Sequence, residues 1–170
     1  MSDKIFEDGI KSAVSLIAIA GKTAPKAKGL DALEIKVMTP AQKKKLTAKM
    51  KEIAKAGYNS RIFLRDSAGV AKADAIILIG SSDIERGLDC RFCGYLCKTR
   101  KGICAYTGVD LGIALGSMVS TASALKIDNR IMYTAGYAAV NGGFLSKKIK
   151  AAFGIPLSVS SKNIFFDRKK

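Results

Sequence analysis

The spacing of apolar side chains predicts a helix at the start of the chain. Between residues 4 and 20, apolar residues recur with polar residues between them, as on a helix that is buried along most of its length. These apolar residues are Ile5, Phe6, Ile10, Val14, Ile17 and Ile19. Gly21 is expected to end the helix, and residues 22–31, which contain Pro25 and Gly29, are expected to form a loop.

The pattern then changes to a strand followed by a second helix. Residues 33–38 alternate between apolar and polar side chains, which is typical of a half-exposed strand. Thr39, Pro40 and Gln42 form a capping box, because the Thr39 side chain can accept from a free backbone N–H while Gln42 reaches back. A helix is therefore predicted from residue 40 to Gly57.

Further strands and helices are expected to alternate in the second half of the chain. The pattern is ambiguous for residues 61–73, whereas the continuous apolar run at 75–80 predicts a strand that is buried on both faces. Helices are predicted at 109–125 and 140–153, and strands at 129–134 and 155–159. This order indicates an α/β (α+β) fold with helices packed around a central mixed sheet, in a single domain spanning residues 1–170.

Small residues recur at every fourth position of the helix predicted at 109–125. They are Gly112, Gly116, Ser120 and Ala124. Such a row lets another backbone come close, and we expect tight packing inside the monomer in preference to a dimer contact.

The charge of the chain indicates attraction to anions. Lys and Arg number 29 against 14 acidic residues, which gives a formal charge of +15. Nucleic acid, a phosphorylated cofactor and an acidic protein partner are all candidates, and so is a surface with no particular partner. The basic residues are spread along the chain and form no arginine-and-aromatic stripe, which argues against nucleic acid.

Localisation follows from the apolar stretches. None is both long and uninterrupted enough to span a membrane, and acidic residues precede the first one, unlike in a signal peptide. We therefore expect a soluble cytoplasmic protein with no membrane contact.

Histidine is absent from the sequence. Its absence excludes Ser-His-Asp and Cys-His nucleophiles, HExxH zinc proteases and histidine proton shuttles. Catalysis would have to come from a metal, a cofactor, or Lys, Tyr and carboxylate chemistry, and no catalytic residue is identified.

Four cysteines, Cys90, Cys93, Cys97 and Cys104, lie within a short cysteine segment, residues 90–104, and the chain has no others. If residues 90–97 form helical turns, the first three cysteines share one side, and Cys104 returns from the loop around Gly102. This arrangement can surround one metal centre.

Three interpretations of the four cysteines compete. Zinc prefers two separated CxxC pairs, whereas an iron–sulfur cluster tolerates compact, irregular spacing. Disulfides are disfavoured because nothing in the sequence indicates secretion. Neighbouring cations would stabilise the thiolates; they are Arg91, Lys98, Arg100 and Lys101. The sequence favours an iron–sulfur cluster, of the 4Fe–4S type, with zinc as the alternative.

Three stretches of the sequence resemble a family of archaeal and bacterial ferredoxin-domain proteins. They are Lys22–Asp31, the cysteine segment continuing through Val109–Ser117, and Asp128–Tyr133 together with Gly154–Pro156 and Lys162–Arg168. The resemblance implies a cluster at the four cysteines, and with it a redox function and a redox protein partner.

The loop Ala24–Asp31 is also similar to a loop that lies beside the flavin in nitroreductases. This resemblance implies a nitroreductase-like fold, into which the cysteine segment is inserted, and a homodimer. It further implies that FMN phosphate is bound by Lys22, Thr23, Lys26 and Arg168 through charge-assisted hydrogen bonds. The alternative is a solvated basic loop.

Two functions therefore compete at this stage. The first is an iron–sulfur redox protein, an oxidoreductase or electron-transfer protein, that passes electrons through a four-cysteine cluster and on to a flavin. The alternative is a zinc-stabilised basic module that binds nucleic acid or an acidic protein partner. A third interpretation is a cluster-bearing sensor or assembly factor without turnover.

Overall fold

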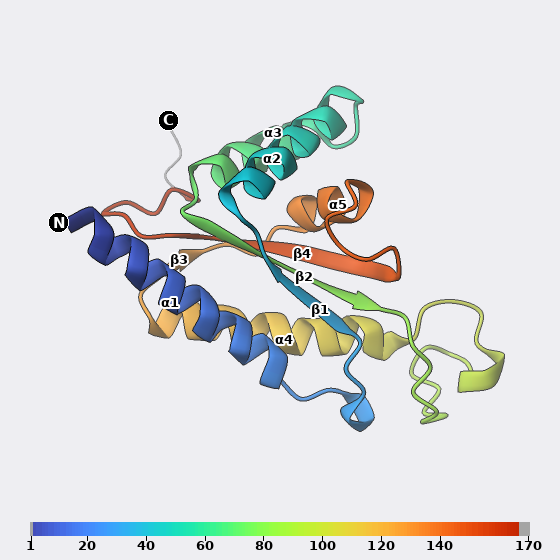
Figure 1. The fold of residues 1–170 in the computed structure, drawn as a ribbon. Coiled ribbons are helices and arrows are strands. Elements are labelled where there is room, and N and C mark those ends of the chain that lie inside the picture. Colours follow the sequence, from blue (N-terminus) through green and yellow to red (C-terminus); the bar gives the residue numbers. More distant parts are fainter. Residues whose placement is uncertain (1, 167–170) are drawn as a thin grey trace.

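A four-stranded sheet lies between two layers of helices in the computed structural model, which describes residues 2–166 (Figure 1). The strands follow the order β1-β2-β4-β3, and every neighbouring pair is antiparallel. Their bounds are Leu33–Val37 for β1, Ala75–Ser82 for β2, Asp128–Asn129 for β3 and Ile149–Ser158 for β4. The α/β class is confirmed, but the sheet is antiparallel throughout where a mixed sheet was expected.

Each face of the sheet is covered by its own helices (Figure 1). One face carries α1 (Ser2–Thr23) and α4 (Ala105–Ala124). The other carries α2 (Pro40–Lys55), α3 (Ser60–Lys72) and α5 (Tyr133–Asn141).

Strand β2 supplies side chains to both cores. Ile77 and Ile79 pack against α1 and α4, while Ile76 and Leu78 pack against the three helices on the other face. This alternation confirms the prediction of a strand that is buried on both sides.

The capping box at the start of α2 is formed as predicted. The Gln42 backbone N–H donates to Thr39 Oγ1 at 3.3 Å, and the Thr39 backbone N–H donates to Gln42 Oε1 at 3.0 Å. Both bonds satisfy amide groups that have no partner within the helix. The helix ends at Lys55, just before Gly57.

The predictions for residues 129–159 need correction. The strand predicted at 129–134 is reduced to β3, because α5 already begins at Tyr133, and the helix predicted at 140–153 is wrong. Helix α5 ends at Asn141, and Gly143 has a φ of 68°, a backbone conformation that favours glycine. The chain then enters β4, which pairs along the whole of β2. The ambiguous residues 61–73 are helical, in α3.

The row of small residues on α4 does not pack inside the monomer, so that prediction is also wrong. Gly112, Gly116, Ser120 and Ala124 all lie on the exposed side of the helix. A Cβ atom added to Gly112 or Gly116 would meet no atom within 4 Å. Close packing occurs in α5, where a Cβ on Gly136 would lie 1.9 Å from the carbonyl oxygen of Ala152.

Within residues 2–166, no helix combines the length and the apolar character needed to cross a membrane.

Candidate metal centre

The four cysteines surround one pocket at the end of the molecule where β2 leads into α4. They lie on the long loop that connects β2 to α4 and extends away from the sheet, drawn in yellow-green in Figure 1. Cys90 is exposed, Cys93 and Cys97 are partly exposed, and Cys104 is buried. All four are free thiols.

Turns, and not a regular helix, bring the cysteines together. Arg91 has a φ of 57° and Gly94 a φ of 86°, so neither fits the helical turns considered for residues 90–97. The helical part of this stretch is a short 3₁₀ turn, Cys97–Thr99. The juxtaposition of the four thiols therefore depends on left-handed residues that a helical pattern does not indicate.

Cys104 is held firmly to the body of the protein. It is the N-cap residue of α4, is only 7% exposed, and its backbone N–H donates to Asp83 Oδ1 at 3.1 Å. Asp83 also accepts from Thr107 Oγ1 at 3.2 Å and from Arg100 at 2.7 Å. Asp83 thus fixes the start of α4 and, with it, the position of Cys104.

These contacts also determine how Asp83 titrates. Burial acts to raise the pKa of the Asp83 carboxyl, but the hydrogen bonds from Arg100, the Cys104 backbone and Thr107 outweigh it and lower the pKa below its ordinary value of 3.8. The same contact with Asp83 raises the pKa of the Arg100 guanidinium. Both groups are therefore charged at neutral pH.

Cys97 is positioned by a reciprocal contact with Asp89. The Asp89 backbone N–H donates to Cys97 Sγ at 3.3 Å, and the Cys97 backbone N–H donates to Asp89 Oδ1 at 2.8 Å. Contacts of this kind orient the side chains that bind a metal.

A set of four thiolate donors suits both an iron–sulfur cluster and a zinc ion. Zn–S bonds of about 2.3 Å require sulfur atoms within about 4 Å of one another. Among residues 2–166, no three Cys, Asp or Glu side chains are arranged to hold a single metal ion. In an iron–sulfur cluster the thiolates bind different iron atoms, so they line a larger space together. The four thiols line one small pocket together.

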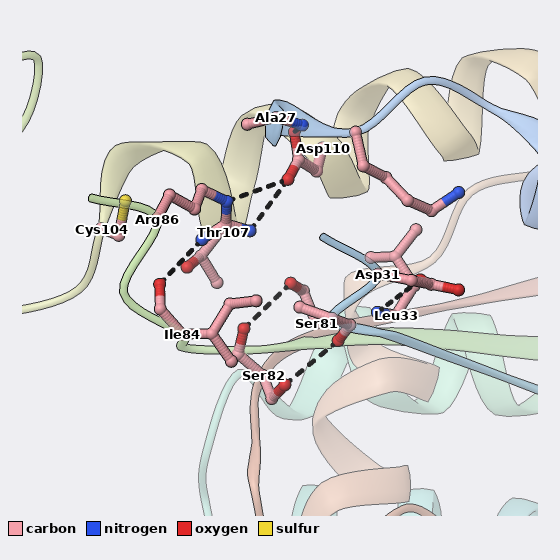
Figure 2. A network of polar contacts seen from close by, with 12 residues as sticks. Ala27, Asp31, Leu33, Ser81, Ser82, Ile84, Arg86, Cys104, Thr107 and Asp110 are labelled. Carbon is pink, nitrogen blue, oxygen red and sulfur yellow. Dashed lines mark hydrogen bonds and ion pairs between the residues drawn. The ribbon is translucent and has the colours of Figure 1, made fainter. Parts of the chain in front are cut away.

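A buried ion pair connects the cysteine pocket to the rest of the protein (Figure 2). Arg86 lines the pocket, and its guanidinium donates to Asp110 Oδ2 at 2.8 and 3.2 Å and to the Ile84 carbonyl at 3.0 Å. Asp110 in α4 also accepts from the Ala27 backbone N–H at 3.1 Å. The pair thus joins three segments: the one that precedes the cysteines, α4, and the loop at 24–31.

Sequence reasoning missed this ion pair. One signal was available, because Asp110 shares a helix face with Thr107, Leu111 and Ala114, all of which are buried. A carboxylate on a buried face requires a partner, and Arg86 provides it.

The side chains predicted to bind a flavin phosphate make local contacts instead of gathering into one site. Lys22 pairs with Asp31, and Thr23 Oγ1 donates to the Ile19 carbonyl at 3.0 Å. Lys26 donates to the Lys22 and Ala24 carbonyls at 2.6 and 2.7 Å, which closes the end of α1. Arg168 lies outside the described residues.

A second, larger cavity lies along α3. It has a volume of about 820 Å³ and is bordered by α3, by the segment before α5 and by the last described residues. We call it the basic cavity, because its lining includes Arg61, Arg65, Lys72 and Arg130 beside Met132, Ile164 and Phe165. No local pattern in the sequence indicates this cavity, since these residues come from three distant segments.

Comparison with known proteins identifies relatives of this chain. A family described as "Uncharacterized protein containing a ferredoxin domain (DUF2148)" matches residues 100–168, which include Cys104. An uncharacterized protein of Archaeoglobus fulgidus is 39% identical over 182 residues, covering 99% of this chain and 97% of the relative.

Solved structures with a similar fold include nitroreductases. A nitroreductase with bound FMN from Desulfitobacterium hafniense has a TM-score of 0.61 at 18% identity, over 89% of this chain and 78% of its own. A nitroreductase with bound FMN from Bacteroides fragilis has a TM-score of 0.66 at 12% identity, over 94% of this chain and 82% of its own. These likenesses confirm the expected nitroreductase-like fold.

Proposed function

The chain belongs to this family of ferredoxin-domain proteins, and from that premise we propose that it is a redox protein whose four cysteines hold an iron–sulfur cluster. The observation that carries the proposal is the position of the four free thiols around one pocket. The ferredoxin-domain family supports a redox role, and the cluster is proposed to be of the 4Fe–4S type.

The chain's own residues would hold and tune such a cluster. Cys104 is a fixed ligand at the start of α4, while Cys90, Cys93 and Cys97 come from turns that can adjust to the bound group. The Asp89 N–H donates to the Cys97 sulfur, which would orient this sulfur as a ligand. Bound there, the cluster would accept and release single electrons, and nearby cations would offset its negative charge.

A flavin is the second cofactor that we propose. The structures from D. hafniense and B. fragilis carry FMN on a similar fold. Of the places considered for a flavin here, the basic cavity is the better supported, because it combines volume and apolar surface with the cations Arg61 and Lys72. In the same cavity Arg65 pairs with Asp66, and Arg130 donates to the Phe165 carbonyl. The loop at 22–31 is less suitable, since Lys22 and Lys26 are engaged in local contacts.

The competing function is a zinc-stabilised binding module. The charge of +15 supports a binding role for acidic molecules. Four thiolates bind zinc as well as iron, so the metal content of the protein decides between the two functions.

Purification without oxygen, followed by iron, zinc and flavin assays and an absorption spectrum, separates these functions. A brown protein that contains iron, with broad absorption near 400 nm that bleaches on reduction, is the result we expect. A colourless protein with one zinc ion per chain would support the binding module instead. Bound flavin that is lost on changing Arg61 and Arg65 to Ala would support the basic cavity as its site.

A further inference from the structure

The surface around the cysteine pocket exposes five large apolar side chains. Phe92 is 65% exposed and Ile103 is 54% exposed. We call the full set the apolar rim; it consists of Leu88, Phe92, Tyr95, Leu96 and Ile103. Exposed apolar groups that gather in one place mark interaction sites.

Contacts show that the apolar rim belongs to the cysteine site. Leu88 and Tyr95 line the same pocket as the four cysteines, together with Tyr106 of α4. The Phe92 ring meets the Tyr106 ring edge to face, with centroids 6.1 Å apart. Leu96 and Ile103 directly precede Cys97 and Cys104 in the chain.

Three cations without partners lie in the same segment of the chain as the apolar rim. Arg91, Lys98 and Lys101 are exposed, and within residues 2–166 no hydrogen bond or ion pair engages their side chains. Among the acids nearby, Asp83 pairs with Arg100, whereas Asp89 accepts from the Cys97 backbone N–H and Glu85 is exposed. Within residues 2–166, the three free cations thus outnumber the two acids here that have no cationic partner.

Exposed apolar side chains with charges of one sign beside them are typical of a protein-docking surface. Resting on the redox function proposed above, we propose that the apolar rim and these three cations form the docking face for an acidic protein that carries single electrons. One electron would leave the reduced carrier, which is thereby oxidised, and would reduce the iron–sulfur cluster that the four cysteines are proposed to hold; no bond is made or broken. A protein fits this surface better than single-stranded nucleic acid does, because three of the five rim residues are aliphatic and cannot stack on bases.

Binding of a plant-type ferredoxin, an acidic electron carrier, tests the docking face. The dissociation constant is measured by surface plasmon resonance on the metal-loaded protein at about 50 mM and about 200 mM salt. Lys98→Glu/Lys101→Glu is expected to weaken binding at least about tenfold at the lower salt, because it reverses the charge beside the pocket. Lys44→Glu/Lys45→Glu changes the net charge equally but lies on exposed positions of α2, and it is expected to weaken binding less than about threefold.

A second pair of variants tests the apolar contribution. Phe92→Ser is expected to weaken binding about tenfold without changing its salt dependence. The matched control is Phe6→Ser, which removes a similarly exposed ring from α1 and is expected to have no effect.

Several results would overturn the docking face. One is that ferredoxin does not bind at low salt. Others are that the two charge-reversal variants weaken binding equally, or that the two phenylalanine variants do. The last is that a short oligouridylate displaces the ferredoxin at a concentration below that of the ferredoxin. Because binding is measured without electron transfer, the two proposals fail separately. If the variants at the pocket weaken ferredoxin binding more than their controls do but the protein carries no cluster, the redox function alone is contradicted. If the protein carries an iron–sulfur cluster but the variants and their controls bind equally, the docking face alone is contradicted.

Discussion

At the scale of single residues, the four cysteines differ in how they are held, and their substitution should therefore have different consequences. We expect Cys90→Ser and Cys104→Ser each to abolish full iron loading, because both thiols line the pocket. In metal-free protein, only Cys104→Ser should lower the free energy of unfolding, by about 1–2 kcal/mol, because a hydroxyl then replaces a buried thiol. Iron analysis and urea unfolding with a chelator measure the two effects. Full iron content in Cys90→Ser would contradict its role as a ligand.

Asp83 provides a prediction that depends on pH. Asp83→Asn should lower the free energy of unfolding at pH 7 by about 1.5–3 kcal/mol, because charge-assisted hydrogen bonds from Arg100 and the Cys104 backbone are weakened. The pKa of Asp83 is lowered in the folded protein, so its contribution is complete above the ordinary value of 3.8 and is lost as the pH falls through the folded-state pKa.

The difference in free energy of unfolding between wild type and Asp83→Asn should consequently become smaller below about pH 4. Urea unfolding across the acid range measures it. Glu85→Gln is the matched control, since Glu85 is exposed two residues away, and it should leave the stability unchanged within about 0.5 kcal/mol. A gap that stays constant down to pH 3 would show that the Asp83 charge is not what stabilises this region.

At the scale of elements, the Arg86–Asp110 pair joins the pocket to α4. Arg86→Met should lower the free energy of unfolding by about 3–5 kcal/mol, because Asp110 would remain as an unpaired buried charge. The double variant Arg86→Met/Asp110→Leu should lose less stability than Arg86→Met, since no charge is then left buried. Thermal and urea unfolding compare the two.

Lys11→Met is the control for this pair, because Lys11 and its partner Asp8 are both largely exposed. It should change stability by less than about 0.5 kcal/mol. A double variant less stable than Arg86→Met would indicate that the Ala27 contact of Asp110, and not the charge pair, is the main stabilising interaction.

Two glycines in helices should respond in opposite ways to the same change. Gly136→Ala would place a methyl group against the Ala152 backbone, so α5 would have to move away from β4, and we expect a loss of more than about 3 kcal/mol. Gly116→Ala meets no neighbouring atom and should raise stability by up to about 1 kcal/mol through helix propensity. Calorimetric melting temperatures measure both. Equal changes in melting temperature for Gly136→Ala and Gly116→Ala would contradict the close approach of α5 to the sheet.

Some elements could be predicted because their signals are local. The capping box at Thr39 fixes the start of α2, and the apolar run of β2 indicates burial on both faces. The helix predicted at 140–153 was wrong because its apolar spacing also suits a strand, and pairing with β2 decides between them. Pairing partners lie far away in the sequence, so a local pattern does not contain this information.

At the scale of the whole molecule, the cysteine site was only partly predictable. Clustering in the sequence indicated a common site, and the structure gathers the four thiols around one pocket. The left-handed turn at Arg91 and the contacts of Asp83 and Arg86 were not predictable, because they depend on how the segment meets α4. The basic cavity was missed for the same reason, since three distant segments form it.

Acid-labile sulfide is the measurement that tests the central claim most directly, because neither zinc, free thiols nor disulfides contain it. In protein purified and reconstituted without oxygen, we expect about four sulfide ions and about four iron ions per chain. The variant with serine at all four cysteine positions should remain folded by circular dichroism and contain neither. Sulfide absent from the folded wild type, or retained by the serine variant, would contradict the account.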